Sequence, residues 1–268
     1  EDFKDKEVLE YYVELPGDRE ILENLKSKSP VLLRGSRGVG KSFLLRIVDV
    51  ELSEQYSKDK ILPVYMTLAP ASFVKVGDEG FTPWMISKIS QAIKRSAEKL
   101  GITITEKSSI YNLINQQPSE KEYIKSVEEF WRIDSPALAP NGIPDIEDFK
   151  YSIEKFCEEY EIDRVILLID EAAHVFLPQQ QRDFFTMMRD MRSAYVSIKA
   201  AVYPGTTIYG PFFEPEHDAI TVNIDRSLTH KDFTELMYKI VEKQSDLSNS
   251  NNNFKAVSYT HLTLPTNR

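Results

Sequence analysis

The chain contains little cysteine and no long apolar segment. Its 268 residues include a single cysteine, Cys157, which excludes an intramolecular disulfide. This is typical of a reducing compartment, and an extracellular chain without disulfide bridges is the alternative. No apolar run approaches the ~20 residues needed to cross a bilayer. The start of the sequence also lacks the basic and apolar regions of a signal peptide. We therefore expect a cytoplasmic protein without a membrane partner.

Acidic residues outnumber basic ones. Lys and Arg number 33 against 42 Asp and Glu, which gives a formal net charge of −9. This balance argues against a broad surface that neutralises phosphates, so nucleic-acid binding would require a local basic patch or a further domain. Hydrophobic residues make up 41% of the chain, the ordinary globular range, which excludes a mostly disordered or collagen-like protein.

Short apolar runs alternate with segments of helical periodicity, a pattern that favours an α/β fold with a parallel sheet covered on both faces. The patterns predict strands at 30–34, 61–68, 165–169, 196–202 and 219–224. They predict helices at 19–26, 41–54, 82–100, 119–131, 145–160 and 179–195. Asp18 is expected to cap the first of these helices. Pro63 favours an edge position for the strand at 61–68, because proline cannot donate to a neighbouring strand.

A glycine-rich segment follows the first predicted strand and opens a helix. Residues 35–42, GSRGVGKS, match the pattern G-x-x-x-x-G-K-[ST] completely, although the chain has only 10 glycines. Backbone N–H groups in such a loop can wrap a phosphate, and the helix N-terminus adds its dipole. The alternative is an ordinary glycine turn followed by a surface lysine. We expect nucleotide contacts from Gly35, Ser36, Arg37, Gly38, Val39, Gly40, Lys41, Ser42 and Phe43.

Two of these residues have specific predicted roles. Lys41 would reach the β- and γ-phosphates of ATP and thereby assist catalysis, and the Ser42 hydroxyl would complete the shell of Mg²⁺. ATP and Mg²⁺ are therefore the expected cofactors.

A second motif, VILLIDE at 165–171, places two carboxylates at the end of an apolar strand. Ligands of open α/β sheets bind at the carboxyl ends of the strands. Asp170 would hold Mg²⁺ through water, and Glu171 would orient and deprotonate the attacking water. Taken alone the pattern is weak, because strand ends are often acidic. The sequence contains no Asn-Lys-x-Asp motif of the kind expected in a GTPase.

Together these features resemble the AAA+ and STAND branches of P-loop ATPases, especially origin-recognition-like bacterial and archaeal ATP-binding proteins. The resemblance extends over about residues 12–245 and includes VELPGDREILENL at 13–25 and AVYPGTT at 201–207. It implies a P-loop NTPase three-layer sandwich with strand order 5-1-4-3-2, a helical insertion and a partial helical lid. It also implies an adenine seat near Tyr12, although core packing is the commoner role for such an aromatic.

The domain organisation follows from this resemblance. We expect a core at 1–225 with a helical insertion at about 70–160, the start of a lid at 226–247, and a linker with a tail at 248–268. Residues 257–268, VSYTHLTLPTNR, resemble a translated sequencing adapter, so we interpret them as non-native and expect the natural chain to continue past about residue 256. A natural strand-like tail is the alternative.

Other family positions stay open. Tyr203 and Pro204 stand where a polar sensor is expected, which leaves Thr206 or Thr207 as candidates. Candidates for an arginine finger are Arg189, Arg192 and Arg226, and His174 is interpreted as structural.

The functional prediction is ATP binding and Mg²⁺-dependent hydrolysis that drives a conformational switch, with ATP and ADP as ligands. The alternatives are a nucleotide-gated scaffold or signalling switch with little turnover, and a DNA-associated initiator or loader. Further candidate partners are a second copy of the chain, in a homo-oligomer, and a protein client. We expect residues 70–160 to determine which client is recognised.

Overall fold

The computed structural model describes residues 5–15, 17–68, 81–111, 145–172 and 177–225, together with residues 238, 239, 241, 243 and 245. The helices are α1 (Asp5–Tyr11), α2 (Asp18–Lys26), α3 (Lys41–Asp59), α4 (Phe81–Lys99), α7 (Ile146–Glu159), α8 (Pro178–Asp190) and α9 (Pro215–Asp218). The strands are β1 (Val31–Arg34), β2 (Ile61–Thr67), β3 (Arg164–Asp170), β4 (Val196–Val202) and β5 (Ile220–Asn223).

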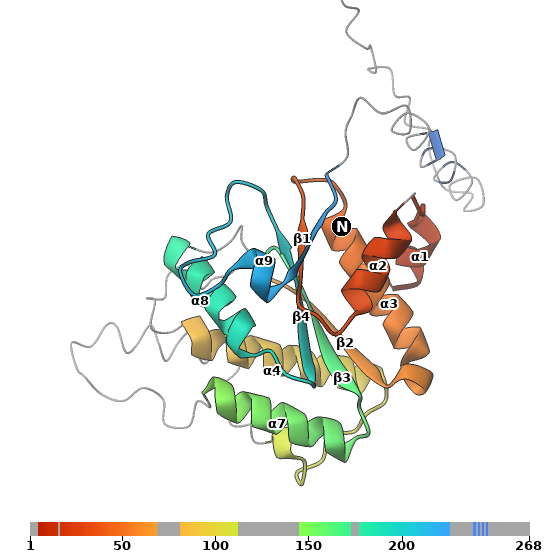
Figure 1. Ribbon diagram of the computed structural model, residues 1–268. Coiled ribbons are helices and arrows are strands. Elements are labelled where there is room, and N and C mark those ends of the chain that lie inside the picture. Colours follow the sequence, from red (N-terminus) through yellow and green to blue (C-terminus); the bar gives the residue numbers. More distant parts are fainter. Residues whose placement is uncertain are drawn as a thin grey trace, which may run out of the picture.

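The five strands form one sheet in the order β2-β3-β4-β1-β5, and each neighbouring pair is parallel (Figure 1). This is the order 5-1-4-3-2 that the resemblance implied, so the predicted fold class is confirmed. β2 lies at one edge of the sheet, as Pro63 predicted. The interior strands β3 and β4 are almost wholly buried, which explains the apolar run at 165–169 in β3, whereas β4 also buries the polar residues Ser197 and Lys199.

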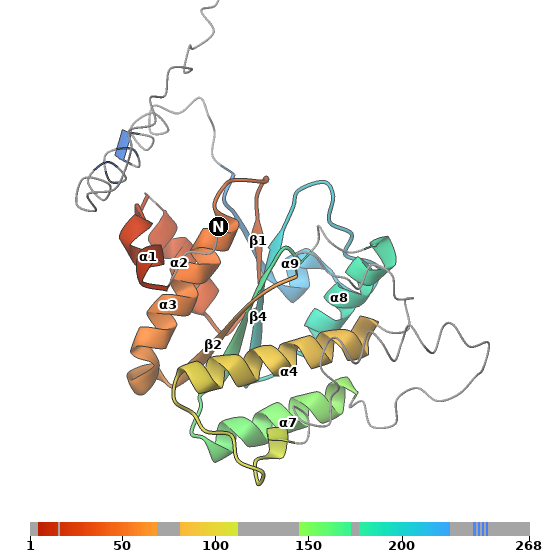
Figure 2. The same cartoon turned by 180° about the vertical axis from the view of Figure 1, so that it is seen from behind.

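Helices cover both faces of the sheet. Helices α1, α2 and α3 lie on one side, whereas α4, α7 and α8 lie on the other (Figures 1 and 2). Alternation along β1 divides its side chains between two cores. Leu33 packs in the cluster with α3, whereas Leu32 packs in the cluster with α4, α7 and α8. Arg34 therefore projects toward the same side as Leu32.

Three helix boundaries differ from the sequence expectation. Helix α3 continues to Asp59, and the chain leaves it at Lys60, whose φ is 54°. Helix α8 ends at Asp190 rather than 195, because the Ser193 hydroxyl accepts the N–H groups of the next residues as the chain turns into β4. Asp18 is not the cap of α2: Gly17 holds that position, and the Asp18 carboxylate accepts the N–H of Leu15. The predictions for 119–131 lie outside the described residues.

Two cations fix the turn between α2 and β1. The buried Lys199 ammonium donates to the carbonyl oxygens of Ser27, at 2.8 Å, and Ser29. Arg164 donates to the carbonyl of Lys26 at 3.0 Å. Burial, together with a smaller contribution from the nearby Arg164, lowers the pKa of Lys199 to about 7. These contacts attach the end of α2 to the middle of the sheet.

Candidate functional site

The 35–42 loop leaves the carboxyl end of β1 and leads into α3. Its first residue is tightly enclosed: a Cβ atom on Gly35 would lie 2.8 Å from both Ile224 Cγ1 and Val39 Cγ2. The Gly35 N–H also donates to the carbonyl of Val202 at 3.3 Å, which continues the pairing with β4. Glycine is therefore favoured here for space, because a Cβ atom would push against the side chains of Ile224 and Val39.

The two later glycines are needed for their backbone conformation rather than for lack of space. Gly38 and Gly40 have φ values of 83° and 97°, in the left-handed region that favours glycine. A Cβ atom at either position would meet nothing within 4 Å. The loop is thus a concave turn with open space on its outer side, and successive N–H groups in such turns form anion-binding nests. The residues present fit a bound phosphate.

The Lys41 ammonium lies against the loop. It donates to the carbonyl oxygens of Gly35 at 2.5 Å and Ser36 at 2.8 Å, and it lies 3.8 Å from the centre of the Tyr203 ring. A lysine ammonium carries three N–H groups, so one stays available for a phosphate oxygen. Burial lowers the pKa of Lys41, and the carboxylates of Asp170, Asp225 and Glu171 oppose that shift.

Asp170 is the last residue of β3, so it lies at the carboxyl end of the sheet, as the 35–42 loop does. Its side chain is 5% exposed. Its carboxylate accepts the Tyr65 hydroxyl at 3.2 Å and the Glu171 N–H at 2.9 Å. Burial and the Asp170 charge together raise the pKa of Tyr65. Tyr65 is a contributor that the sequence analysis missed, because only the β2–β3 register brings it beside the carboxylate.

Glu171 has a backbone conformation that is unusual for its residue type. Its φ is 56°, in the left-handed region, which costs about 1–2 kcal/mol for a residue with a Cβ. Local strain of this kind gathers at functional sites. The side chain is partly exposed.

Asp225, two residues after the end of β5, is a second residue that the sequence analysis missed. Its carboxylate accepts the Ser36 N–H at 2.7 Å. This hydrogen bond, with smaller contributions from Lys41 and Arg34, lowers the pKa of Asp225, which is therefore a carboxylate at neutral pH. The only available signal was the 5-1 strand adjacency, which places the end of β5 beside the loop.

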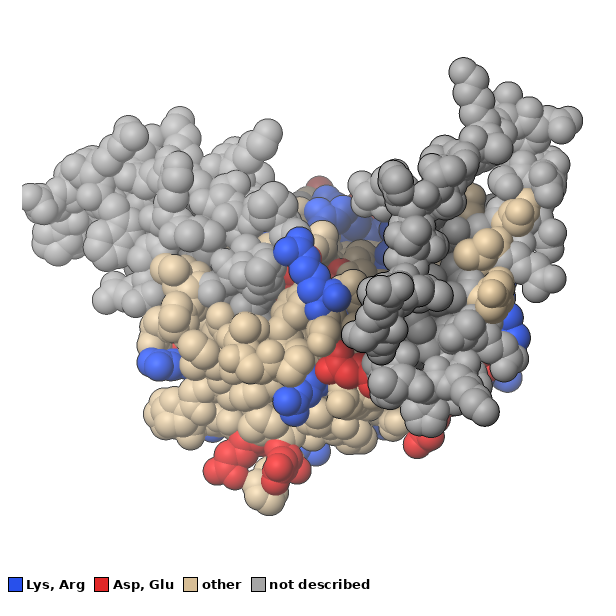
Figure 3. All heavy atoms as spheres, turned by 90° about the horizontal axis from the view of Figure 1, so that it is seen from above, with Lys and Arg blue, Asp and Glu red and all other residues tan. Residues whose placement is uncertain are grey.

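Seen from above, this edge of the sheet carries basic and acidic side chains close together (Figure 3). No group of three or more metal-ligating side chains lies within the described part of the chain. Mg²⁺, however, commonly takes only one or two protein ligands beside phosphates and water. Exposed Ser42 at the start of α3 and the carboxylate of Asp170 are of the chemical types that such a site uses.

The N-terminal segment packs beside the start of α3. The Tyr12 ring lies 6.2 Å from that of Phe43, and its hydroxyl donates to Asp18 at 3.2 Å. Lys243, from the predicted lid, donates to the carbonyl of Tyr12. Tyr12 thus has the packing role that the sequence analysis gave as the alternative to an adenine seat.

The remaining candidates are only partly placed. The Thr207 hydroxyl donates to the carbonyl of Tyr203 at 2.8 Å and accepts its N–H at 3.1 Å, so it closes a turn. Arg189 is bound to Asp190 and to the carbonyl of Phe212. Arg192 is exposed and stays a candidate for the arginine finger. Arg226 and His174 lie outside the described residues.

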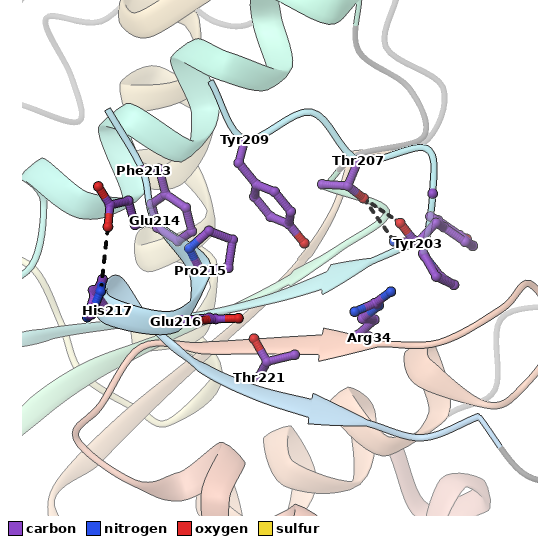
Figure 4. Close-up of a pocket in the computed structure, with 12 residues that line it drawn as sticks. Arg34, Tyr203, Thr207, Tyr209, Phe213, Glu214, Pro215, Glu216, His217 and Thr221 are labelled. Carbon is purple, nitrogen blue, oxygen red and sulfur yellow. Dashed lines mark hydrogen bonds and ion pairs between the residues drawn. The ribbon is translucent and has the colours of Figure 1, made fainter. Parts of the chain in front are cut away.

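A separate cavity of about 490 Å³ lies behind the loop. Its walls come from Arg34 of β1, from Thr221 of β5, from the segment that follows β4 and from helix α9 (Figure 4). Tyr203 borders both this cavity and Lys41. The sequence analysis did not predict it.

A family model described as ORC-CDC6-like matches residues 1–69, a segment that contains β1, the 35–42 loop, α3 and β2. This match supports a relationship to P-loop ATPases. No curated protein matches the chain.

Among solved structures, the chain is similar to a crystal structure of Pif1 helicase from Candida albicans. The identity is 14% and the TM-score is 0.34, over 92% of this chain and 50% of that chain. The chain thus spans half the length of that structure, and a likeness of this strength carries no argument about function. Among the described helices, none has both the length and the apolar character needed to span a bilayer.

Proposed function

We propose that this protein binds ATP together with Mg²⁺ and hydrolyses it to drive a conformational switch. One observation carries the proposal: the glycine loop, the Lys41 ammonium and the Asp170–Glu171 pair meet at one edge of a parallel sheet, where such folds bind ligands. The ORC-CDC6-like match over residues 1–69 supports the nucleotide-binding part of the proposal.

The phosphates would bind at the concave side of the loop. Backbone N–H groups from Gly38 to Phe43 would face the β-phosphate, assisted by the positive end of the α3 dipole. Lys41 would contribute its remaining N–H to the β- and γ-phosphates, while the Gly35 and Ser36 carbonyls hold its ammonium in place. Because the lysine is already anchored, little side-chain entropy is lost on binding.

Mg²⁺ would be held by the Ser42 hydroxyl and, through water, by Asp170. The ion supplies charge neutralisation for the transferring phosphoryl group. The Tyr65 hydroxyl orients the Asp170 carboxylate by its 3.2 Å hydrogen bond, so that one carboxylate edge is fixed relative to the sheet.

Glu171 would act as the general base. It follows the metal-site aspartate, and its carboxylate would accept the proton of a water that attacks the γ-phosphate. The N–H of Glu171 is bound to Asp170, which couples the orientation of the base to that of the metal-site carboxylate.

Removal of the γ-phosphate would change the conformation of the segment that follows β5. Asp225 binds the loop through Ser36, and it immediately precedes the predicted lid. Lys243, further along this predicted lid, contacts the N-terminal segment at Tyr12. A change in the loop can therefore be passed to residues 226–247 through Asp225.

Two substitutions test the proposal. Lys41→Ala should abolish ATP binding in calorimetry, since the loop would lose its one buried cation. Glu171→Gln should keep ATP binding and lower hydrolysis by at least about a hundredfold, the usual contribution of a general base. Wild type that binds ATP without turnover would instead favour the nucleotide-gated scaffold. DNA binding that depends on ATP would favour the initiator or loader.

A further inference from the structure

The cavity behind the loop has the size and shape of a ligand site. Its volume of about 490 Å³ falls within the ~300–1,000 Å³ typical of small-molecule pockets. It lies on the Leu32 side of β1, whereas α3 covers the opposite side. The cavity is therefore distinct from the concave side of the 35–42 loop.

One cation, Arg34, lines this cavity. Arg34, the last residue of β1, lies between Tyr203 and Thr221 in Figure 4. Within the described part of the chain, its guanidinium makes no hydrogen bond and no ion pair. A guanidinium presents parallel N–H groups that match the two oxygens of a carboxylate. Arg34 acts electrostatically on the nearby Asp225 carboxylate, but its N–H groups are not hydrogen-bonded to it and can bind an anionic group in the cavity.

The wall opposite Arg34 is aromatic. Tyr209 and Phe213 are stacked with ring centres 5.8 Å apart and an interplanar angle of 19°. Phe185 supports Tyr209 from the core, with ring centres 4.6 Å apart. This arrangement gives a rigid apolar surface, against which a planar or apolar ligand body can pack.

Charge at the rim limits the anions that fit. Glu214 and Glu216 both line the cavity, and His217 lies 3.7 Å from Glu214. Arg34 is the one lysine or arginine among the lining residues. The lining thus holds one positive charge against two carboxylates, so a doubly charged phosphate ester is disfavoured relative to a monoanion.

The geometry points to a binding site for a small monocarboxylate with an aromatic or apolar body. The carboxylate binds Arg34, and the body packs on Tyr209. This inference goes beyond ATP hydrolysis and stands whether or not ATP is bound. It also gives the site a route to the loop, because Arg34 precedes Gly35 and Tyr203 contacts Lys41.

The test uses phenylacetate as the probe and measures its binding to the full chain by calorimetry and ligand-observed NMR. Its neutral isostere phenylacetamide and the dianion phenyl phosphate serve as matched ligands. We expect saturable binding of phenylacetate at or below about 10 mM, and at least tenfold weaker binding of the amide. Phenyl phosphate should also bind more weakly than phenylacetate.

Variants locate the binding. Arg34→Gln should weaken phenylacetate binding at least tenfold. The affinity of Arg34→Lys should lie between those of wild type and Arg34→Gln, because the lysine ammonium keeps the charge but lacks the bidentate geometry of the guanidinium. Exposed Arg95 on α4 provides the control: Arg95→Gln should bind as wild type does.

The inference is overturned if phenylacetate does not bind, if acid and amide bind equally, or if Arg34→Gln leaves binding unchanged. Abolition of binding by saturating ATP·Mg²⁺ would place the cavity within the nucleotide site and overturn it as well. Failure of ATP binding with phenylacetate binding intact would refute the proposed function alone.

Discussion

The contact between Asp225 and the loop leads to an unusual prediction: loss of this carboxylate should tighten ATP binding. Asp225 accepts the Ser36 N–H at 2.7 Å, at the entrance to the proposed phosphate site. Asparagine in its place still accepts that hydrogen bond but carries no charge. Asp225→Asn therefore removes the repulsion between this carboxylate and the phosphates while it preserves the loop.

The size of the effect follows from Coulomb's law. At a separation of about 7 Å in water, two unit charges interact by about 0.6 kcal/mol, so the net −2 of ATP·Mg²⁺ meets about 1.2 kcal/mol of repulsion. The carboxylate is exposed, so salt screens this interaction. We expect affinity to rise about fivefold at 10 mM salt and about twofold at 150 mM, where the Debye length is about 8 Å.

Calorimetry of ATP·Mg²⁺ binding at the two salt concentrations measures this directly. Asp148→Asn, on the exposed first turn of α7, is the matched control and should change neither value. Unchanged or weaker binding by Asp225→Asn would refute the electrostatic reasoning. Weaker binding would mean that the charge is needed to hold the loop in shape.

Three further predictions concern the frame of the site. Lys199 has its pKa lowered from 10.5 to about 7, so the cost of burying its charge is fully present below pH 7 and disappears as the pH rises to 10.5. Wild type should thus gain stability relative to Lys199→Met between pH 7 and pH 9.5 in urea unfolding, and a constant difference would contradict the burial argument. Gly35→Ala should destabilise the fold by about 1–3 kcal/mol, because the new Cβ overlaps Ile224; a wild-type melting temperature would show that the loop yields freely. Burial raises the pKa of the Cys157 thiol to about 12, so a disulfide reagent at pH 8 should label it only after unfolding, and rapid labelling of the native protein would count against this packing.

The sequence predicted the sheet well because short, mainly apolar strands alternate with helical segments. The signature is clearest at 165–169, which are all apolar and buried, and it is weaker at 196–202, where Ser197 and Lys199 interrupt the apolar residues. The strand order came from the family resemblance, since composition and periodicity contain no information about which strands are neighbours.

The site was predictable only where its residues are contiguous. The 35–42 loop and Asp170 are local motifs, and the structure brings them to one edge. Tyr65 and Asp225 reach the site through strand register and adjacency, so no local pattern could reveal them. The end of α8 was missed because the Ser193 hydroxyl, rather than a glycine, turns the chain into β4.

The most direct test of the central claim is calorimetric titration of the purified protein with ATP and Mg²⁺, beside its Lys41→Ala variant. The account predicts saturable binding by wild type, at micromolar to low millimolar ATP, and none by the variant. Absence of binding by wild type, or equal binding by both proteins, would contradict the assignment of the 35–42 loop as a phosphate site.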